Sequence, residues 1–165
     1  MKQIVIGILA VLALYGCNGN AQQINNKKMS KLIYVMDPLC GWCYGNSANT
    51  QHLYDTYKNQ IDFEILPAGM WIGENARKQS KPMAQYIKKH DLQIQQVTGT
   101  AFGQDYFKFV ENESIVLDSE IPSRAIVTVK KIWATQAVSF AIEVQKARYL
   151  HAKDLNDDAT YLSIC

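Results

Sequence analysis

Two cysteines separated by two residues are the part of this sequence best suited to chemistry. Cys40 and Cys43 stand in the run DPLCGWCYG (37–45). A thiolate attacks disulfides, and a thiol three positions further on can reach back across one helical turn to release the product. We therefore predict that Cys40 is a nucleophile and that Cys43 resolves the mixed disulfide. Gly41 and Trp42 lie between them and are expected to tune the redox chemistry.

The elements around the pair are expected to place Cys40 where a strand gives way to a helix. The run KLIYVM (31–36) has the composition of a buried strand, and Pro38 cannot continue its hydrogen bonds. The segment 43–58 contains no proline and can be helical. Cys40 would then lie among backbone N–H groups that have no partner within the helix, at the positive end of the helix dipole. That position favours a thiolate.

Other readings of a C-x-x-C pair fit this sequence less well. A zinc site needs four ligands, and the remaining candidates are scattered along the chain: Cys17, Cys165, His52, His90 and His151. We therefore predict no metal and no cofactor. A haem attachment needs His after the second cysteine, where Tyr44 stands. A structural disulfide stays open, although so short a loop gains little stability from its closure.

A second strand is expected close behind the dithiol. Residues 61–66 (IDFEIL) alternate between apolar and polar, and Pro67 and Gly69 should end the strand. Strand, helix and strand at this spacing form a right-handed parallel unit, with the active site at the carboxyl ends of the strands. We expect Trp42 to cover the thiols, and Trp71 and Tyr44 to contact substrate at the rim.

The segment 73–152 is predicted to be helical. Ser80 should cap a helix that ends at Gly99, and apolar spacing predicts two more helices, one opened by Pro122 and one running from Thr135 to His151. Residues 114–117 are the one further candidate strand. The apolar stripe of the first helix is Met83, Ile87, His90, Ile94 and Val97. Aromatic residues at helical spacing more often belong to the core than to a peptide-binding groove. We therefore assign Phe102, Tyr106, Phe107 and Phe109 to the core.

The N-terminal residues read as an export signal. Residues 4–16 form an uncharged apolar run too short for a comfortable membrane span. We expect residues 1–16 to be a signal peptide of the lipoprotein type, Cys17 to carry a lipid, and 17–30 to be a polar linker. Ordinary cleavage after Ala21 and translation from Met29 stay open as alternatives.

The dithiol motif and several later fragments carry a resemblance. DPLCGWCYG after a strand resembles the thioredoxin-fold dithiol proteins, and more narrowly the DsbA-like thiol:disulfide oxidoreductases with their FrnE-like branch. The segments 67–69 (PAG), 102–107 (FGQDYF), 118–125 (DSEIPSRA) and 154–158 (DLNDD) are similar to that branch. The resemblance implies an α/β thioredoxin-like β-α-β unit at 31–72 with a helical insertion at 73–152.

Members of the family complete the sheet with two further strands, entered by a loop with a cis-proline beside the dithiol. None of Pro38, Pro67, Pro82 and Pro122 precedes a strand in the required place. We therefore expect a C-terminally truncated chain that lacks these strands, with 153–165 as the start of a truncated helix and Cys165 as a core residue.

These observations predict a thiol:disulfide oxidoreductase of the bacterial envelope or periplasm, anchored through Cys17. Its partners would be exported proteins that contain cysteine, and a redox-recycling protein. A net charge of +2 without a basic cluster gives no reason to expect nucleic-acid binding. The alternatives are a non-catalytic envelope lipoprotein with a structural disulfide, and a glutathione-using isomerase of the same superfamily.

Redox tuning is expected to depend mainly on the helix terminus. Thioredoxins commonly bury an acid six residues before the first cysteine, where this chain has Tyr34, and the dipeptide between the thiols contains no His. We therefore predict a moderate lowering of the Cys40 pKa, partly offset by the charge of Asp37.

Overall fold

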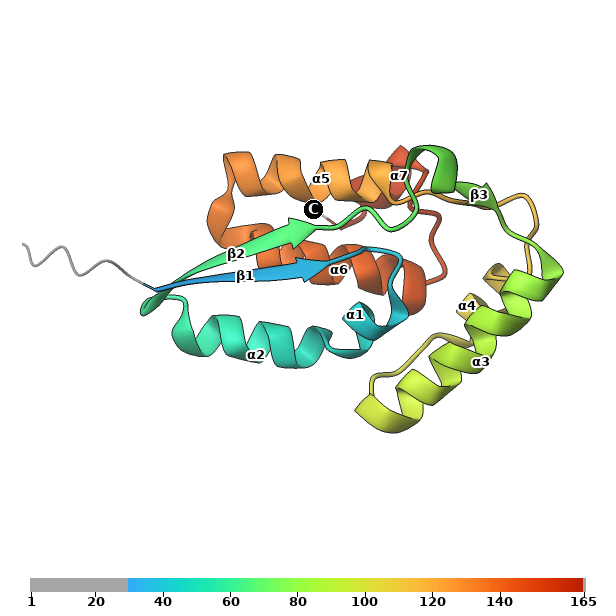
Figure 1. The fold of residues 1–165 in the computed structure, drawn as a ribbon, viewed down its shortest axis with the longest axis horizontal. Helices are drawn as coiled ribbons and strands as arrows, with labels where there is room; N and C mark the ends of the chain where they lie inside the picture. Colours follow the sequence, from blue (N-terminus) through green and yellow to red (C-terminus); the bar gives the residue numbers. More distant parts are fainter. Residues whose placement is uncertain (1–29, 165) are drawn as a thin grey trace, which may run out of the picture.

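The centre of the structure is a parallel pair of strands joined through helices. The computed structural model describes residues 30–164, in which β1 (Ser30–Met36) pairs with β2 (Ile61–Pro67) from Ser30 opposite Ile61 to Met36 opposite Pro67. The connection contains α1 (Gly41–Gly45) and α2 (Ser47–Tyr57) (Figure 1). Both predicted strands and the helix between them are confirmed, except that Asn46 divides the helix in two. The predicted signal peptide, the lipidation site Cys17 and Cys165 lie outside the described residues.

Two later helices pack against this strand pair. They are α5 (Glu120–Ile132) and α6 (Ala137–Tyr149), connected by the 3₁₀ turn η2 (Ala134–Gln136). Both contact β2, and α6 also contacts α1 and α2. Because side chains alternate along a strand, Met36 and Ile65 face the interior while Ile33 and Val35 are exposed. The helices thus hold the carboxyl end of β1, from which the dithiol follows.

A second group of elements lies beyond the carboxyl ends of the strands (Figure 1). It contains α3 (Lys81–Thr98) and α4 (Gln104–Phe109), and α3 contacts α1. The two short antiparallel strands β3 (Arg77–Lys78) and β4 (Val116–Leu117) frame these helices in sequence. The 3₁₀ turn η1 (Gly73–Asn75) precedes them, and α7 (Asp158–Leu162) is the last described helix.

Local signals predicted several helix ends well and others with a shift. The Ser80 side chain accepts a hydrogen bond from Met83 N, and Gly99 ends α3 in a left-handed conformation, both as expected. Pro122 lies inside the first turn of α5 instead of opening it, and η2 occupies the position where Thr135 was expected to cap a helix. Val97 is exposed, which corrects its place on the predicted stripe, because Ile94 is the last buried residue of α3.

The interior has two parts, which we name the sheet core and the aromatic core. The sheet core is mostly aliphatic and consists of Met36, Leu39, Ile65, Leu117, Ile126, Ala137, Val138, Ala141, Ile142, Val144, Ala147 and Leu155. The aromatic core consists of Tyr44, Ile94, Phe102, Tyr106, Val110 and Tyr149, with Phe107 and Phe109 packed against it. The assignment of the four predicted aromatic residues to a core is therefore confirmed.

The assignment of residues 73–152 to one insertion domain stays a prediction. Part of this range packs on the strand pair, and part forms the second group of elements. Within residues 30–164, no helix is both long enough and apolar enough to cross a membrane.

Candidate active site

A tight turn carries the chain from β1 into the dithiol helix. Asp37 O accepts a hydrogen bond from Cys40 N at 3.1 Å, and Asp37 Oδ1 accepts one from Leu39 N at 2.8 Å. Cys40 is extended, with φ −92° and ψ 111°, and is the N-cap of α1, which begins at Gly41. Pro38 suits this turn because it cannot donate to a continuing strand. The predicted placement of Cys40 at a strand-to-helix junction is confirmed.

The surroundings of Cys40 favour its thiolate. A hydrogen bond from the Cys43 thiol is the largest cause that lowers the Cys40 pKa from 9.0 to about 6. The backbone N–H groups of Cys43 and Trp42 lower the pKa further, while partial burial and the charge of Asp37 raise it. The expectation that the helix terminus would be the main cause is therefore wrong, since the neighbouring thiol contributes more.

Cys43 has the opposite character. Its hydrogen bond to Cys40 and its partial burial raise the pKa of Cys43 well above the ordinary range, because both favour the protonated thiol. Both cysteines are free and half-buried. The pair therefore consists of one thiolate and one thiol that donates to it, which suits an attacking sulfur followed by a resolving one.

The buried carboxylate of Asp37 fixes the loop opposite the dithiol. Its Oδ2 accepts a hydrogen bond from Met70 N at 2.6 Å, and its Oδ1 accepts one from the Ser119 hydroxyl at 2.9 Å. Ser119 in turn accepts from Trp71 N at 3.2 Å and donates its own backbone N–H to Trp71 O at 2.8 Å. The loop after β2 and the start of α5 are thus attached to the turn that carries Cys40.

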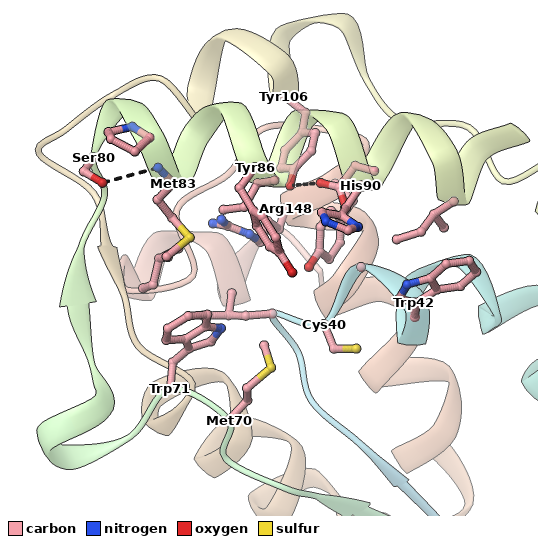
Figure 2. Close-up of a pocket in the computed structure, with 18 residues that line it drawn as sticks. Cys40, Trp42, Met70, Trp71, Ser80, Met83, Tyr86, His90, Tyr106 and Arg148 are labelled. Atoms are coloured by element: carbon pink, nitrogen blue, oxygen red, sulfur yellow. Dashed lines mark hydrogen bonds between the residues drawn. The ribbon is translucent and has the colours of Figure 1, made fainter.

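A cavity of about 660 Å³ opens beside Cys40. Figure 2 shows Met70 and Trp71 on one side of it and the side chains of α3, which include Met83, Tyr86 and His90, on the other. Cys40 lines this cavity, and its volume is in the range of small-molecule sites. A ligand in the cavity would therefore meet the thiolate of the pair.

The residues predicted to surround the thiols have different positions. Trp42 lines the cavity and is 47% exposed, and Trp71 lines it with the Arg77 guanidinium 4.6 Å from its ring centre. Tyr44 does not lie on the rim, which corrects the prediction: it is 3% exposed, and its ring stacks on Tyr149 with 4.8 Å between centres. The Tyr44 hydroxyl donates to Ala101 O at 2.7 Å, so its polar end is already used.

Sequence reasoning missed a buried polar group that lies against the dithiol helix. Asp91 of α3 accepts a hydrogen bond from the Tyr106 hydroxyl at 2.6 Å, and Arg148 of α6 lies close enough to lower the pKa of Asp91. Gly41 leaves room for this carboxylate, because a Cβ at Gly41 would collide with Asp91 Oδ1. The signal was present: Asp91 follows Ile87 by four residues on the apolar face of α3, and Arg148 follows Val144 by four on α6.

Within the described residues, no cluster of three or more His, Cys, Asp and Glu side chains is arranged to hold a metal ion.

Comparison with known proteins gives structural neighbours. No family model and no curated protein matches the chain. Among solved structures, the cytosolic disulfide reductase DsbM from Pseudomonas aeruginosa is similar over 81% of this chain and 62% of its own, with a TM-score of 0.68 and 29% identity. A candidate protein disulfide isomerase from Nitrosomonas europaea is similar over 83% of this chain and 63% of its own, with a TM-score of 0.72 and 22% identity.

The fold is thioredoxin-like. The predicted fold class is therefore confirmed, and the neighbours are thioredoxin-like oxidoreductases, as the resemblance implied. They do not single out the FrnE-like branch. A structure of DsbM with GSH is similar to the same extent, with 27% identity and a TM-score of 0.68. This chain spans less than two thirds of the length of each of these neighbours.

Proposed function

We propose that this protein is a thiol:disulfide oxidoreductase that acts through Cys40 and Cys43. The observation that carries the proposal is the position of Cys40, which is the N-cap of α1, lines a cavity and has Cys43 one helical turn further on. The hydrogen bond from Cys43 lowers the pKa of Cys40, which supports the proposal. At neutral pH a thiol with a pKa of about 6 is mostly thiolate, the form that attacks disulfides. The neighbours named as a disulfide reductase and a candidate isomerase support the same class of activity.

In the reductive direction, the Cys40 thiolate attacks one sulfur of a substrate disulfide. A mixed disulfide forms, and the other substrate sulfur leaves as a thiolate that takes a proton from water. Cys43 then loses its proton and attacks the Cys40 sulfur, which closes the Cys40–Cys43 disulfide and releases the second substrate thiolate. The proton becomes easier to remove from Cys43 once Cys40 is no longer an anion, since the charge of Cys40 is among the causes that raise the Cys43 pKa. Oxidation of a substrate is the same sequence in reverse.

For substrates and location, we propose cysteine-containing exported proteins in the bacterial envelope or periplasm. The apolar run at 4–16 and the cysteine that ends it support export and a lipid on Cys17. A redox-recycling partner is required because each turnover changes the oxidation state of the pair. Membership of the DsbA-like family, including its FrnE-like branch, belongs to the same proposal. The similar DsbM is named as cytosolic, so cell fractionation of the full chain tests this part directly.

A second candidate function is exchange with a small thiol such as glutathione. The cavity beside Cys40 favours it, because its volume suits a small molecule, and a similar structure is named as DsbM with GSH. This function uses the same two cysteines and is compatible with protein substrates.

Trapping of a mixed disulfide tests the proposal against a purely structural disulfide. The Cys43→Ser variant should accumulate a covalent adduct with a disulfide protein such as insulin, because the first attack proceeds and the resolving thiol is missing. The matched Cys40→Ser variant should form none, and the reduced wild type should release its adduct. Adducts would be counted by mass spectrometry after acid quenching. The absence of an adduct with Cys43→Ser, or equal adducts with both variants, would contradict the roles of the two cysteines.

A further inference from the structure

The cavity beside Cys40 contains a buried cation without a counter-ion. Arg148 is 3% exposed and lines the cavity, and its Nε has no hydrogen-bond partner in the described part of the chain. Between residues 30 and 164 it forms no ion pair either. A charge removed from water is costly unless an opposite charge or hydrogen bonds compensate it.

Aromatic rings hold the guanidinium in place. Its central carbon lies 5.9, 5.4 and 5.8 Å from the ring centres of Tyr106, Phe109 and Tyr149. Rings attract a cation through their faces, but they accept no strong hydrogen bonds from its N–H groups. The Nε of Arg148 therefore stays without a partner that an anionic ligand could supply.

Asp91 is the acidic side chain that lines the same cavity, and it forms no ion pair with Arg148. Asp91 is 4% exposed, and burial raises its pKa to about 6 while the charge of Arg148 lowers it. Its Oδ2 is used by the Tyr106 hydroxyl. The other titratable groups that face this region are Tyr86 and His90 on α3, Tyr149 on α6 and Cys40 at the start of α1. Arg148 is the one permanently positive side chain among these cavity residues.

The rest of the cavity suits the body of a small ligand. Its walls are mainly apolar, with Leu39, Met70, Trp71, Met83, Ile87 and Leu117 among them. Arg148 and Cys40 both line the cavity, and Figure 2 shows Arg148 close to Tyr86, with Cys40 below it at the start of α1. A molecule of suitable length can therefore meet the guanidinium at one end and the reactive sulfur at the other.

We propose that Arg148 binds the carboxylate of a small thiol or disulfide and thereby directs its sulfur to Cys40. The inference rests on the proposed exchange chemistry of the dithiol and assigns a ligand class to the same site. In the oxidised protein, the thiolate of the small molecule attacks the Cys40 sulfur, which forms a mixed disulfide and releases Cys43 as a thiolate. A second small thiolate attacks the sulfur of the bound molecule, which leaves as a small disulfide and returns Cys40 to the thiolate.

Glutathione and its diethyl ester provide the test, because they differ only in their carboxylates. The measurement is the rate at which each thiol reduces the Cys40–Cys43 disulfide of the full chain, followed by alkylation and mass spectrometry. Rates are compared at equal thiolate concentration. Each rate is divided by the rate at which the same thiol reduces a small aromatic disulfide, which corrects for the intrinsic reactivity of the thiol. We expect wild type to prefer glutathione about tenfold, the value of one charge-assisted hydrogen-bonded contact.

Three variants locate the effect. Arg148→Met keeps the apolar stem and should abolish the preference for glutathione. Asp91→Asn still accepts the Tyr106 hydroxyl but removes the negative charge that competes for Arg148, so it should increase the preference. Arg124→Met removes an exposed arginine of α5 and is the control for net charge, with the preference unchanged.

The outcomes separate this inference from the proposed function. If wild type reacts equally with the two thiols, or if folded Arg148→Met keeps the preference, Arg148 does not bind a carboxylate, while dithiol exchange stands. If Arg148→Met does not fold, Asp91→Asn decides, and a preference that is unchanged or reduced overturns the inference. If neither thiol reduces the disulfide and no adduct forms on Cys43→Ser with insulin, the proposed function itself fails.

Discussion

The sheet core and the aromatic core meet at the dithiol and differ in what they contain. The sheet core is built from aliphatic side chains, and Cys43 packs against it. The aromatic core contains four rings, and Tyr44, the next residue along α1, is one of them. Two adjacent residues of one short helix are thus anchored in two different interiors.

The difference shows how polar groups can be buried close to a reactive sulfur. Aliphatic side chains offer only close packing, whereas aromatic side chains also offer ring faces to a cation and hydroxyl groups to a carboxylate. Arg148 is surrounded by three rings, and Asp91 accepts a hydrogen bond from the Tyr106 hydroxyl. One core therefore fixes the dithiol in position, and the other places buried charges beside the cavity.

The largest expected effect is a cavity in the sheet core. Ile126 is fully buried in α5, so Ile126→Ala should reduce the free energy of unfolding by about 3 kcal/mol, as is usual for such truncations. Urea denaturation measures this. Ile132→Ala on the same helix is the control, because Ile132 is 74% exposed and its loss should cost less than about 0.5 kcal/mol. Equal losses for the two variants would mean that α5 does not pack on the strand pair.

A smaller effect is expected where the aromatic core contacts a charge. Tyr106→Phe removes the hydroxyl that donates to Asp91, and a hydrogen bond to a charged group contributes about 2 kcal/mol. This bond lowers the pKa of Asp91, so it favours the carboxylate. The loss of unfolding free energy should therefore be greatest above the Asp91 pKa of about 6 and decrease as the pH falls through it.

Urea denaturation at several pH values, with an NMR titration of the Asp91 carboxyl carbon, measures both quantities. Tyr57→Phe is the matched control, because Tyr57 is an exposed residue of α2. A loss in Tyr106→Phe that does not change with pH would show that the hydroxyl does not act on the Asp91 carboxylate.

The strand pair and the dithiol turn could be predicted from the sequence because their signals are local. Proline, alternating apolar residues and the capping serine each act on the backbone within a few residues, and β1, β2 and the start of α3 follow from them. The position of Cys40 as the N-cap of α1 followed from the same kind of signal.

The buried polar groups of the site could not be predicted in this way. Asp91, Tyr106 and Arg148 come from three helices, and only tertiary packing brings them together. Tyr44 was misplaced for a similar reason, since its direction is decided by Tyr149, which is distant in sequence. The short strand β3 was missed because two residues carry no usable pattern, and β4 alone does not show its partner.

The most direct test of the central claim is the pH dependence of Cys40 alkylation by iodoacetamide in the reduced protein, with the modified cysteine identified by mass spectrometry. A folded-state pKa below the ordinary value means that the thiolate persists to lower pH, so the rate should fall as the pH decreases through about 6. Cys43→Ala should move this midpoint upward by about one unit, since the strongest hydrogen-bond donor is lost. A midpoint near 9.0 in the wild type, or faster alkylation of Cys43 than of Cys40, would contradict the account.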